Sequence, residues 1–463
     1  MAEFPFQLQI KSGLSAGQTE ILTCTALLRV VPGSREVYDA LWNKRAVIVK
    51  IFSHKINARR HFKREWRGLN LLQERGINSP KALFFGKTSD GQQAVVAEKI
   101  ADATVVLDVF KRAKNPAQQF DLLMAVCREL SNQHRNGIIQ KDLHLGNFLI
   151  KGERIFTIDP GQVCFFAGEI GKNKSLSQAA LLACSLSGIP DESAVALCRE
   201  YAGYRSWTLE QSDIAFFKKQ MVLLRKRGIK NALRKSLRTS KNYLRIKADG
   251  CVCVFDRSFC QTEQAVEFLR RIDALMDEGQ ILKKGNTCYV SRVMWNNKDV
   301  VVKRYNHKGF IHSLCHTIRR SRARRNWLHG HRLEMLNIDT PKPVAYIEKY
   351  KGLLVWSSYI VTEFVQGQNL HYFLRDENIA KEQKAKTCRR VGELLDKLNK
   401  FRISHGDLKL SNIIIAESGP KLIDLDGMAV HKCKWMYRLR GAKDLKSWED
   451  LQDAAGLNID NAG

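Results

Sequence analysis

The chain has 463 residues, with 76 lysines and arginines against 47 acidic residues, a formal net charge of +29, and 12 cysteines. This length accommodates two or three domains, and a hydrophobic content of 44% excludes low-complexity disorder as the default state. The sequence has no apolar run long enough to cross a membrane and does not begin in the order typical of a secretory signal. We therefore expect a soluble, cytoplasmic protein with reduced thiols, and the charge excess predicts an anionic partner.

The first half of the chain contains an ordered series of predicted elements. A β-branched strand ends at Lys50, and a basic helix over residues 59–76 follows it and ends before Pro80. The next helix is amphipathic, because its apolar residues recur on one face. These residues are Phe120, Leu123, Met124, Cys127 and Leu130. That helix leads into the loop QKDLHLGNFLI at 140–150, and TIDPG follows at 157–161. The order predicts a small β-rich lobe and then a helical lobe, with the polar residues at their junction.

The second half repeats this series. The loop returns as HGDLKLSNIII at 405–415, and LIDLDG takes the place of TIDPG. Three pairs of polar residues are each separated by 265 residues, namely Asp142 and Asp407, Asn147 and Asn412, and Asp159 and Asp424. Lys303 ends a VVVK run that matches the VIVK run ending at Lys50. Repeated anchors in one order predict an α+β chain of two tandem domains, residues 1–238 and 239–463.

Each half carries the residue types that phosphoryl transfer needs. That reaction requires a carboxylate to position or deprotonate the attacking hydroxyl, and oxygen ligands for Mg²⁺ beside a triphosphate. Asp142 and Asp407 are the candidate catalytic carboxylates. The candidate metal ligands are Asn147, Asp159, Asn412 and Asp424. Lys50 and Lys303 are the candidate partners of the α- and β-phosphates. A single Asp-x-x-x-x-Asn usually marks only a capped turn, and the repetition of the whole set favours the catalytic interpretation.

At these motifs both halves resemble the protein-kinase-like fold, and most closely the bacterial lipopolysaccharide core sugar kinases of the Kdo and heptose type. The resemblance rests on HGDLKLSN, on LIDLDG, and on the basic helix at 321–343. It covers most of the second half and, more loosely, the first. The resemblance implies ATP-dependent phosphorylation of an inner-core sugar of a lipopolysaccharide precursor, with Mg²⁺ as cofactor.

The residue expected to orient the nucleotide lysine differs between the halves. Glu65 lies 15 residues after Lys50, so we expect an ion pair between them. The matching position of the second half holds Asn326, which leaves two alternatives open. Either Asn326 hydrogen-bonds Lys303, or Glu334 reaches that lysine from a displaced helix.

The loops around the catalytic and phosphate sites also differ. Lys409 lies two residues after Asp407 and is a candidate catalytic residue, because its ammonium can offset the negative charge on the transferred phosphoryl group. His144 occupies the matching position in the first half. Asp426 is a candidate additional acidic ligand. Gly33 and Gly285 mark short turns 17 and 18 residues before the two lysines, and we expect their backbone amides to contact phosphates.

Positive charge is concentrated in runs. Residues 218–247 contain twelve lysines or arginines and no acid, and the leucine and valine spacing at 221–237 would allow a helix at a membrane interface. Such runs favour an acidic glycolipid and the anionic inner face of the cytoplasmic membrane as partners, and they lack the interleaved aromatic residues of a nucleic-acid surface. A protein kinase and a tandem with one non-catalytic, nucleotide-binding half are the alternatives. We expect the second half to be active, because its catalytic loop is the more complete.

Overall fold

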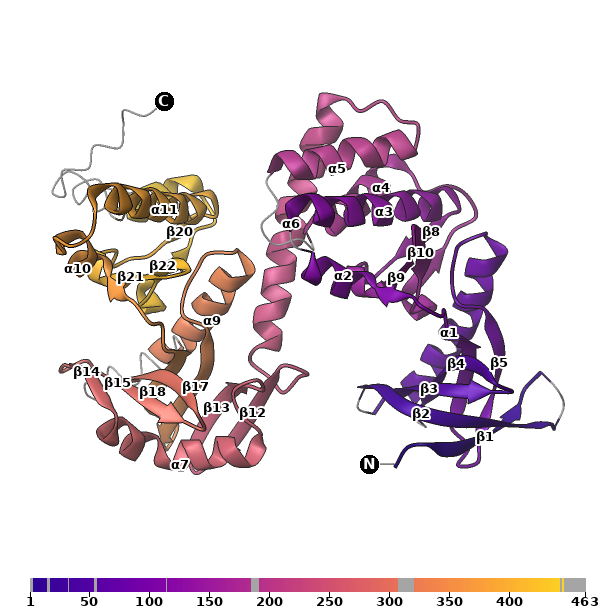
Figure 1. Cartoon of the computed structure of the whole chain (residues 1–463), viewed down its shortest axis with the longest axis horizontal. Helices are drawn as coiled ribbons and strands as arrows, with labels where there is room; N and C mark the ends of the chain where they lie inside the picture. The colour runs from indigo at the N-terminus through magenta and orange to yellow at the C-terminus, as the bar shows by residue number, and fades with distance from the viewer. Residues whose placement is uncertain are drawn as a thin grey trace. The chain divides into compact units, whose positions relative to one another are not determined.

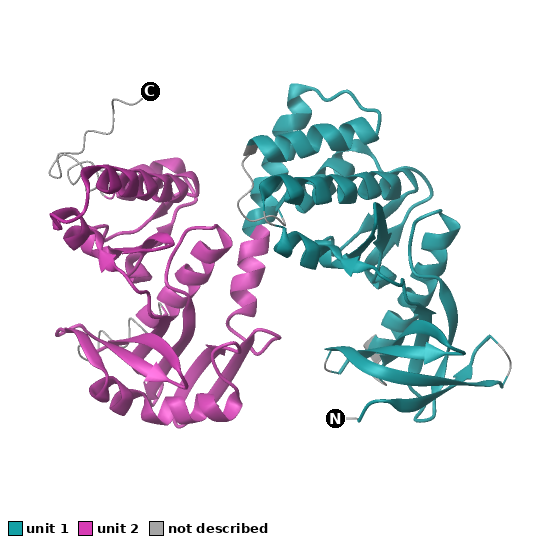
Figure 2. Cartoon of the chain, in the orientation of Figure 1, with its two compact units in different colours: residues 1–226 teal, residues 227–463 magenta. Residues whose placement is uncertain are grey.

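The computed structural model describes residues 3–14, 17–31, 33–53, 56–113, 115–184, 191–306, 320–441 and 444. The chain divides into two compact units, unit 1 over residues 1–226 and unit 2 over residues 227–463 (Figure 2). Each unit combines a strand-rich part with a helical part (Figure 1). Among the described residues, no helix combines the length and apolarity needed to cross a membrane.

The strand-rich part of unit 1 is a closed antiparallel barrel in the order β1-β2-β3-β4-β6-β5. Its strands are β1 (Phe6–Ser12), β2 (Thr19–Val31), β3 (Arg35–Trp42), β4 (Arg45–Phe52), β5 (Ala82–Thr88) and β6 (Gln93–Glu98), with helix α1 (Ile56–Glu74) between β4 and β5. Along β4, Val47, Val49 and Ile51 enter the barrel core. Because side chains alternate across a strand, Lys50 lies on the opposite face.

One hairpin turn recurs in both units, and in each it follows a tryptophan, Trp42 in unit 1 and Trp295 in unit 2. Asn43 and Lys44 between β3 and β4 both have positive φ, and so do Asn296 and Asn297 in unit 2. Two consecutive left-handed residues form the turn that matches the twist of a two-residue hairpin, and asparagine tolerates this conformation well. The preceding tryptophan packs inward in unit 2, where Trp295 is 5% exposed.

The helical part of unit 1 is built around α3. Its elements are β7 (Thr104–Val105), α2 (Val106–Arg112), α3 (Pro116–Arg135), β8 (Ile138–Gln140), η1 (Leu145–Asn147), β9 (Phe148–Lys151), β10 (Arg154–Thr157), η2 (Pro160–Gln162), β11 (Val163–Phe165), α4 (Lys172–Cys184), α5 (Asp191–Tyr204) and α6 (Gln211–Lys235). Leu123, Cys127 and Leu130 of α3 are fully buried, as their spacing predicted. This buried face holds the loop between β8 and β9 against the helices.

Helix α6 spans the division between the units. Leu224 packs against the core of unit 1, whereas Ile229 and Leu233 pack against cores of unit 2. Leu224, Ile229 and Leu233 are therefore used inside the units, whereas Val222 and Leu223 of the same run are 52% and 51% exposed. The expected membrane-interface helix stays a prediction. The division after residue 226 lies within the helix, where the sequence carries no break in composition.

Unit 2 opens with a larger, open sheet in the order β12-β13-β17-β18-β16-β15-β14. Its strands are β12 (Tyr243–Ala248), β13 (Cys251–Asp256), β14 (Gln280–Lys284), β15 (Cys288–Trp295), β16 (Lys298–Tyr305), β17 (Pro343–Lys351) and β18 (Leu354–Glu363). Helix α7 (Thr262–Glu278) buries Phe268 and Ile272 in one core with this sheet. Helix α9 (Arg322–Met335) buries Trp327 in another. The β12–β13 hairpin and α7 had no counterpart in our sequence prediction.

The helical part of unit 2 follows the order of unit 1. Its elements are β19 (Gln368–Asn369), α10 (Leu370–Arg375), α11 (Lys381–Lys400), β20 (Ile403–Ser404), η3 (Leu410–Asn412), β21 (Ile413–Ala416), β22 (Gly419–Leu422), η4 (Leu425–Gly427) and β23 (Ala429–Val430). Cys388, Val391, Leu395 and Leu398 of α11 are buried and share one face of the helix. They pack behind the loop that joins β20 to β21.

Candidate functional site

The two Asp-x-x-x-x-Asn loops have the same internal geometry. In unit 1, Asn147 Nδ2 donates to the backbone oxygen of Asp142 at 2.7 Å, and in unit 2 Asn412 Nδ2 donates to that of Asp407 at 2.8 Å. The backbone oxygens of Asn147 and Asn412 each accept from the residue just before the following aspartate, at 2.9 Å in both units. Because the amide nitrogen is used inside the loop, each asparagine can turn its oxygen to a cation.

The two carboxylates predicted to be catalytic are exposed and differ in their cationic neighbour. Asp407 is 59% exposed, and Lys409 Nζ donates to its Oδ2 at 2.8 Å. This hydrogen bond raises the pKa of Lys409, which keeps the ammonium charged. Asp142 is 72% exposed, and its neighbour His144 is 3.8 Å away. The carboxylate of unit 2 therefore has the stronger positive partner.

A buried histidine supports the loop of unit 2 that carries Asp407. His405 is fully buried, and its Nε2 donates to the backbone oxygen of Ile423, just before Asp424. The carboxylate of Asp444 accepts from the backbone amides of His405 at 2.7 Å and of Gly406 at 3.2 Å. These bonds join the loop to the strand end that carries Asp424.

In both units the second aspartate occupies an unusual backbone position. Asp159 has φ 59° and Asp424 has φ 63°, both in the left-handed region, at the start of the short helices η2 and η4. Aspartate adopts this conformation at less cost than most residues. The turn directs both carboxylates toward the lysine of the neighbouring strand, because Lys50 Nζ lies 3.7 Å from Asp159 Oδ1 and Lys303 Nζ lies 2.5 Å from Asp424 Oδ1.

Unit 1 forms a cluster of two cations and two acids. The expected ion pair between Lys50 and Glu65 of α1 is present. Arg35 adds a second cation, with its Nη2 2.8 Å from Asp159 Oδ2 and its Nη1 4.0 Å from Glu65 Oε2. Burial by itself would raise the pKa of Asp159, but Lys50 and Arg35 outweigh it and hold that pKa below its usual range. Asp159 is therefore an anion at neutral pH.

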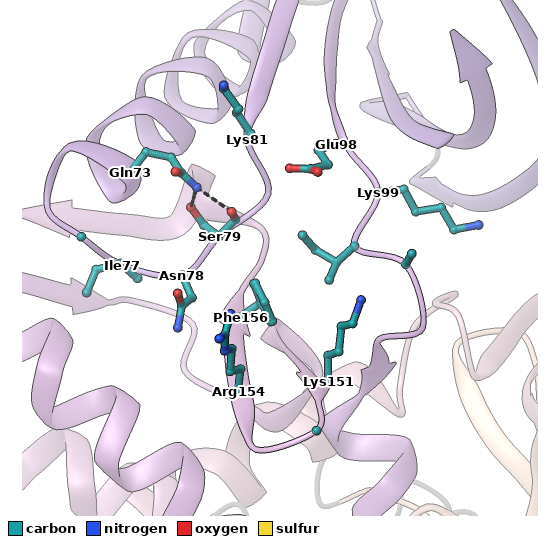
Figure 3. A pocket seen from close by; sticks show the side chains of 14 residues that line it. Gln73, Ile77, Asn78, Ser79, Lys81, Glu98, Lys99, Lys151, Arg154 and Phe156 are labelled. Atoms are coloured by element: carbon teal, nitrogen blue, oxygen red, sulfur yellow. Dashed lines mark hydrogen bonds between the residues drawn. The ribbon is translucent and has the colours of Figure 1, made fainter. Parts of the chain in front are cut away.

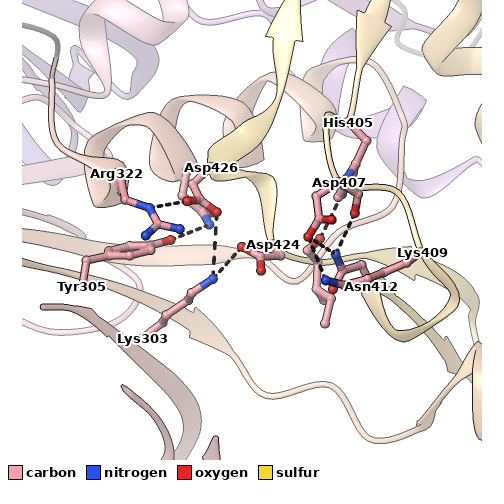
Figure 4. A network of polar contacts seen from close by, with 11 residues as sticks. Lys303, Tyr305, Arg322, His405, Asp407, Lys409, Asn412, Asp424 and Asp426 are labelled. Atoms are coloured by element: carbon pink, nitrogen blue, oxygen red, sulfur yellow. Dashed lines mark hydrogen bonds and ion pairs between the residues drawn. The ribbon is translucent and has the colours of Figure 1, made fainter. Parts of the chain in front are cut away.

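Unit 2 forms a cluster with the same charges on different elements (Figure 4). Lys303 Nζ lies 3.9 Å from Asp426 Oδ1, in addition to its bond with Asp424. Arg322, at the start of α9, donates from Nε to Asp426 Oδ2 at 2.5 Å. Its guanidinium also lies 4.6 Å from the ring centre of Tyr305. The second cation thus comes from the helix, and the second acid from η4.

Neither of the two partners considered for Lys303 is the one observed. Asn326 Nδ2 donates to the hydroxyl of Tyr305 at 3.4 Å, and Glu334 contacts His331 on its own helix at 3.1 Å. An amide cannot neutralise an ammonium, so the lysine pairs with the carboxylates of Asp424 and Asp426 instead. Burial and a hydrogen bond with Asp424 raise the pKa of Asp426, whereas Lys303 and Arg322 oppose that rise.

The position that carries Asp426 in unit 2 carries Gly161 in unit 1, two residues after the left-handed aspartate in each case. A Cβ atom on Gly161 would lie 3.1 Å from Glu65 Oε2, which is closer than an ordinary van der Waals contact. Glycine therefore leaves room for the helix carboxylate in unit 1. In unit 2 the helix carries no carboxylate at the matching position, and Asp426 supplies one from the loop.

The structure places the two glycines that we expected to contact phosphates in hairpin turns. Gly33 has φ 66° between β2 and β3, and its backbone oxygen accepts from Ser53 Oγ at 2.9 Å. Gly285 lies between β14 and β15, where its amide donates to the backbone oxygen of Cys288 at 3.0 Å. The Gly33 turn leads directly into Arg35. Sequence reasoning missed Arg35 and Arg322, which lie far along the chain from the acids they contact.

The residues of unit 1 fit a divalent cation in their chemistry. Oδ1 of Asp159 is buried and makes no hydrogen bond to any described residue. A carboxylate and an amide oxygen are ligands that Mg²⁺ accepts, and this ion usually takes its remaining ligands from phosphates and water. The described residues contain no group of three or more His, Cys, Asp or Glu side chains arranged as a metal cage. These two residues therefore fit a Mg²⁺ ion whose other ligands come from the phosphates of a bound nucleotide and from water.

A cavity of about 910 Å³ opens in unit 1 beside the α1–β5 connection and the β9–β10 turn (Figure 3). Gln73 Nε2 at its edge donates to the backbone oxygen of Ser79 at 2.6 Å. Its charged lining residues are Lys81, Glu98, Lys99, Lys151 and Arg154. None of the predicted catalytic, phosphate or metal residues lines it, so this cavity is separate from the cluster around Lys50.

Comparison with known proteins gives matches to sugar kinases and to other kinase-related proteins. The family model of the lipopolysaccharide kinase (Kdo/WaaP) family matches residues 267–449. The 3-deoxy-D-manno-octulosonic acid (Kdo) kinase of Haemophilus influenzae strain PittEE is 30% identical over 187 residues, which cover 37% of this chain and 75% of the relative. Shorter matches include the KEOPS complex subunit Bud32 of Pyrococcus abyssi, 40% identical over 65 residues that cover 14% of this chain and 29% of that protein.

Proposed function

Because the chain belongs to the lipopolysaccharide kinase (Kdo/WaaP) family, we propose that unit 2 transfers the γ-phosphoryl group of ATP to a Kdo hydroxyl of the lipopolysaccharide inner core. The chain is an ATP-dependent kinase acting on a sugar hydroxyl. The choice of Kdo over heptose is supported by the Kdo kinases of Haemophilus influenzae. The observation that carries the proposal is the arrangement of Asp407, Asn412, Asp424 and Lys303 within the residues that the family model matches.

The exposed carboxylate of Asp407 is placed to receive the proton of the attacking hydroxyl. Lys409, 2.8 Å away, would offset negative charge on the transferred phosphoryl group as the new bond forms. The Asn412 oxygen and the Asp424 carboxylate would hold Mg²⁺. When bound, that ion supplies charge neutralisation between the β- and γ-phosphates.

Lys303 requires a carboxylate that keeps its ammonium directed at the phosphates once Asp424 is engaged by the cation. We assign this role to Asp426, which lies 3.9 Å from the lysine and is itself fixed by Arg322. Asp426 is therefore a positioning residue rather than the additional metal ligand that the sequence suggested.

For unit 1 we propose a second kinase-like domain that binds ATP and Mg²⁺, so that the chain is a tandem of two such domains. The matching geometry of Lys50, Glu65, Asn147 and Asp159 supports this proposal. Asp142 would be its catalytic carboxylate, and His144 gives that residue a weaker positive neighbour than Lys409 gives Asp407. We therefore expect unit 1 to bind nucleotide and to contribute less to phosphoryl transfer, with regulation of unit 2 as its alternative role.

A protein kinase activity is the second candidate. It is favoured by a shorter match to protein kinase kin1 of Schizosaccharomyces pombe, 38% identical over 83 residues, which cover 17% of this chain but only 9% of that protein. The short coverage makes it a weaker guide to the acceptor than the Kdo kinases, of which this chain spans three quarters.

The experiment that separates the candidates is transfer of labelled phosphate from ATP by the purified full chain. The acceptors are a Kdo-containing lipid A precursor, a heptose-containing core and a generic protein substrate. We expect label on Kdo, identified after mild acid hydrolysis. Label on heptose would correct the sugar, and label only on protein would contradict the proposal.

A further inference from the structure

A short helix near the end of unit 2 has a surface that the phosphoryl-transfer chemistry does not use. Residues 434–441 are helical and directly follow the strand β23 and the turn after it. Trp435 is 69% exposed, Leu439 is 59% exposed and Met436 is 47% exposed. Three large apolar side chains in the solvent within one short helix are unusual for a soluble surface, and such groupings mark interaction sites.

The helix is held in the unit by its opposite side. Tyr437 is 7% exposed, and Gly441 lies one turn further along the same face. A Cβ atom on Gly441 would come within 2.6 Å of the Tyr437 ring, so only glycine allows this close packing. At about 100° per residue, Trp435 and Leu439 lie on the side of the helix directly opposite Tyr437. The two most exposed apolar residues therefore point straight out of the unit.

Positive charges flank this apolar ridge on both sides. By the same spacing, Lys434 and Arg438 lie on one flank, and Arg440 lies on the other next to Met436. All three cations are exposed, Lys432 two residues before the helix adds a fourth, and residues 431–441 contain no acidic residue. An outward apolar ridge with a tryptophan and cations along its edges is the arrangement of a helix that lies in a membrane interface.

The charge of the ridge decides between the possible occupants. A second copy of the same ridge would bring like charges together, whereas the surface of an anionic bilayer attracts them and accepts the apolar side chains between its headgroups. Nucleic acid would satisfy the cations but would leave Leu439 and Met436 without an apolar partner. An anionic lipid surface provides partners for the cations and for the apolar side chains.

The chain is also joined to the loop that carries Asp407 on both sides of residues 434–441. Before this segment, β23 pairs with β20, the strand that leads into the loop, and His431 Nε2 lies 2.8 Å from Ser404 Oγ. After it, Asp444 accepts hydrogen bonds from the amides of His405 and Gly406, the two residues before Asp407. A surface that rests on a membrane through this helix would therefore hold Asp407 at a fixed distance from that membrane.

We propose that the helix at 434–441, with Lys432, is the surface by which unit 2 docks on an anionic membrane and brings Asp407 to a membrane-embedded glycolipid. The identity of the acceptor rests on the proposed function, but the docking itself does not. Trp435 and Leu439 insert between the lipids, and the four flanking cations contact the headgroups.

Docking is tested by co-sedimentation of the purified full chain with vesicles that contain no lipopolysaccharide. The vesicles are made of phosphatidylcholine alone or of phosphatidylcholine with phosphatidylglycerol. We expect binding only to the anionic vesicles. The double variant W435S/L439S should bind them at least about tenfold more weakly, and reversing Arg438 and Arg440 to glutamate should lower binding by about fivefold or more for each charge.

The matched control is Leu353→Ser, because Leu353 in the β17–β18 turn is 90% exposed and also lies among lysines but outside the helix. Its vesicle binding should equal that of the unchanged chain. Equal binding by W435S/L439S, or an equal loss in the Leu353 variant, would overturn the assignment. So would binding of the chain to DNA but not to anionic vesicles.

Phosphorylation of a soluble, deacylated acceptor separates this inference from the proposed function. W435S/L439S should retain that activity while losing activity on acceptor embedded in anionic vesicles. Loss on both acceptors with unchanged vesicle binding would mean that the helix serves the catalytic loop and not the membrane. Vesicle binding by a chain that phosphorylates no core sugar would contradict the proposed function alone.

Discussion

Gly161 and Glu65 of unit 1 are placed so that any side chain on the first would meet the carboxylate of the second, since a Cβ atom would lie 3.1 Å from Glu65 Oε2. Unit 2 has the opposite arrangement, because Asp426 takes the place of Gly161 in the loop and Asn326 takes the place of Glu65 on the helix. Both arrangements put one carboxylate beside the lysine that we propose contacts the nucleotide. The carboxylate beside the lysine thus comes from helix α1 in unit 1 and from the loop after Asp424 in unit 2.

This relationship predicts that the carboxylate of unit 2 can be moved back to its helix. Asp426→Gly should lower kcat/KM for ATP about 10²-fold, since Arg322 loses its partner and Lys303 loses the carboxylate that positions it once Asp424 holds the cation. The double variant D426G/N326E should recover at least about tenfold of that loss. Steady-state kinetics with varied ATP measures both effects, and thermal unfolding checks that each variant is folded. A double variant no better than Asp426→Gly would show that Asp426 does not act through the lysine.

The reciprocal exchange applies to unit 1. In a chain whose unit 2 is disabled by Lys303→Met, Glu65→Asn should weaken the binding of a fluorescent ATP analogue about tenfold or more. Adding Gly161→Asp should restore much of that affinity, because the new carboxylate occupies the space that Glu65 vacated. Gly161→Asp alone should instead reduce stability, because it places a second buried carboxylate against Glu65. Equal affinity for all four chains in a titration would contradict a nucleotide-binding role for Lys50.

Asn412 should control the response to Mg²⁺. Asn412→Ala removes an oxygen ligand and also the hydrogen bond to the backbone of Asp407, so the Mg²⁺ concentration for half-maximal activity should rise about 10-fold or more. Asn412→Asp keeps an oxygen at the same place and should show a smaller rise. An unchanged Mg²⁺ titration in the alanine variant would remove this residue from the metal site.

Buried Glu129 of α3 should make the stability of unit 1 depend on pH. Burial raises its pKa from 4.5 to about 7, against the hydrogen bond from Gln133. Between these values the folded chain keeps a proton that the unfolded chain has released, so stability falls as pH rises, by about 1.4 kcal/mol per pH unit for this group. Glu129→Gln should remove this contribution.

Chemical denaturation of the unchanged chain and of the Glu129→Gln variant at a series of pH values gives the comparison. The stability difference between them should grow in favour of the variant from pH 4.5 to pH 7 and then level off above pH 7. A difference that is constant with pH would show that Glu129 is already ionised in the folded chain.

The parts of the site that could be predicted are those that depend on short, contiguous sequence motifs. The Asp-x-x-x-x-Asn loops, the aspartate after the next strand and the strand that ends in lysine each repeat as local patterns. The ion pair from Lys50 to Glu65 followed from the spacing of a strand and its next helix.

The remaining contacts have no local signal. Arg35 meets Asp159 across 124 positions of sequence, and Arg322 meets Asp426 across 104. Such pairings depend on how strands and helices pack, which neither residue type nor spacing encodes. The prediction for Lys303 was wrong for a related reason, since we looked for its partner only on the helix and the carboxylate had moved to the loop.

The most direct test of the account is phosphorylation of a Kdo-containing lipid A precursor by the full chain and by its Asp407→Ala and Asp142→Ala variants. The product is measured by mass spectrometry after a fixed time with ATP and Mg²⁺. We predict that Asp407→Ala lowers the initial rate at least about 10²-fold, whereas Asp142→Ala keeps most of it. Full activity of the Asp407 variant would contradict the central claim that unit 2 carries the phosphoryl transfer.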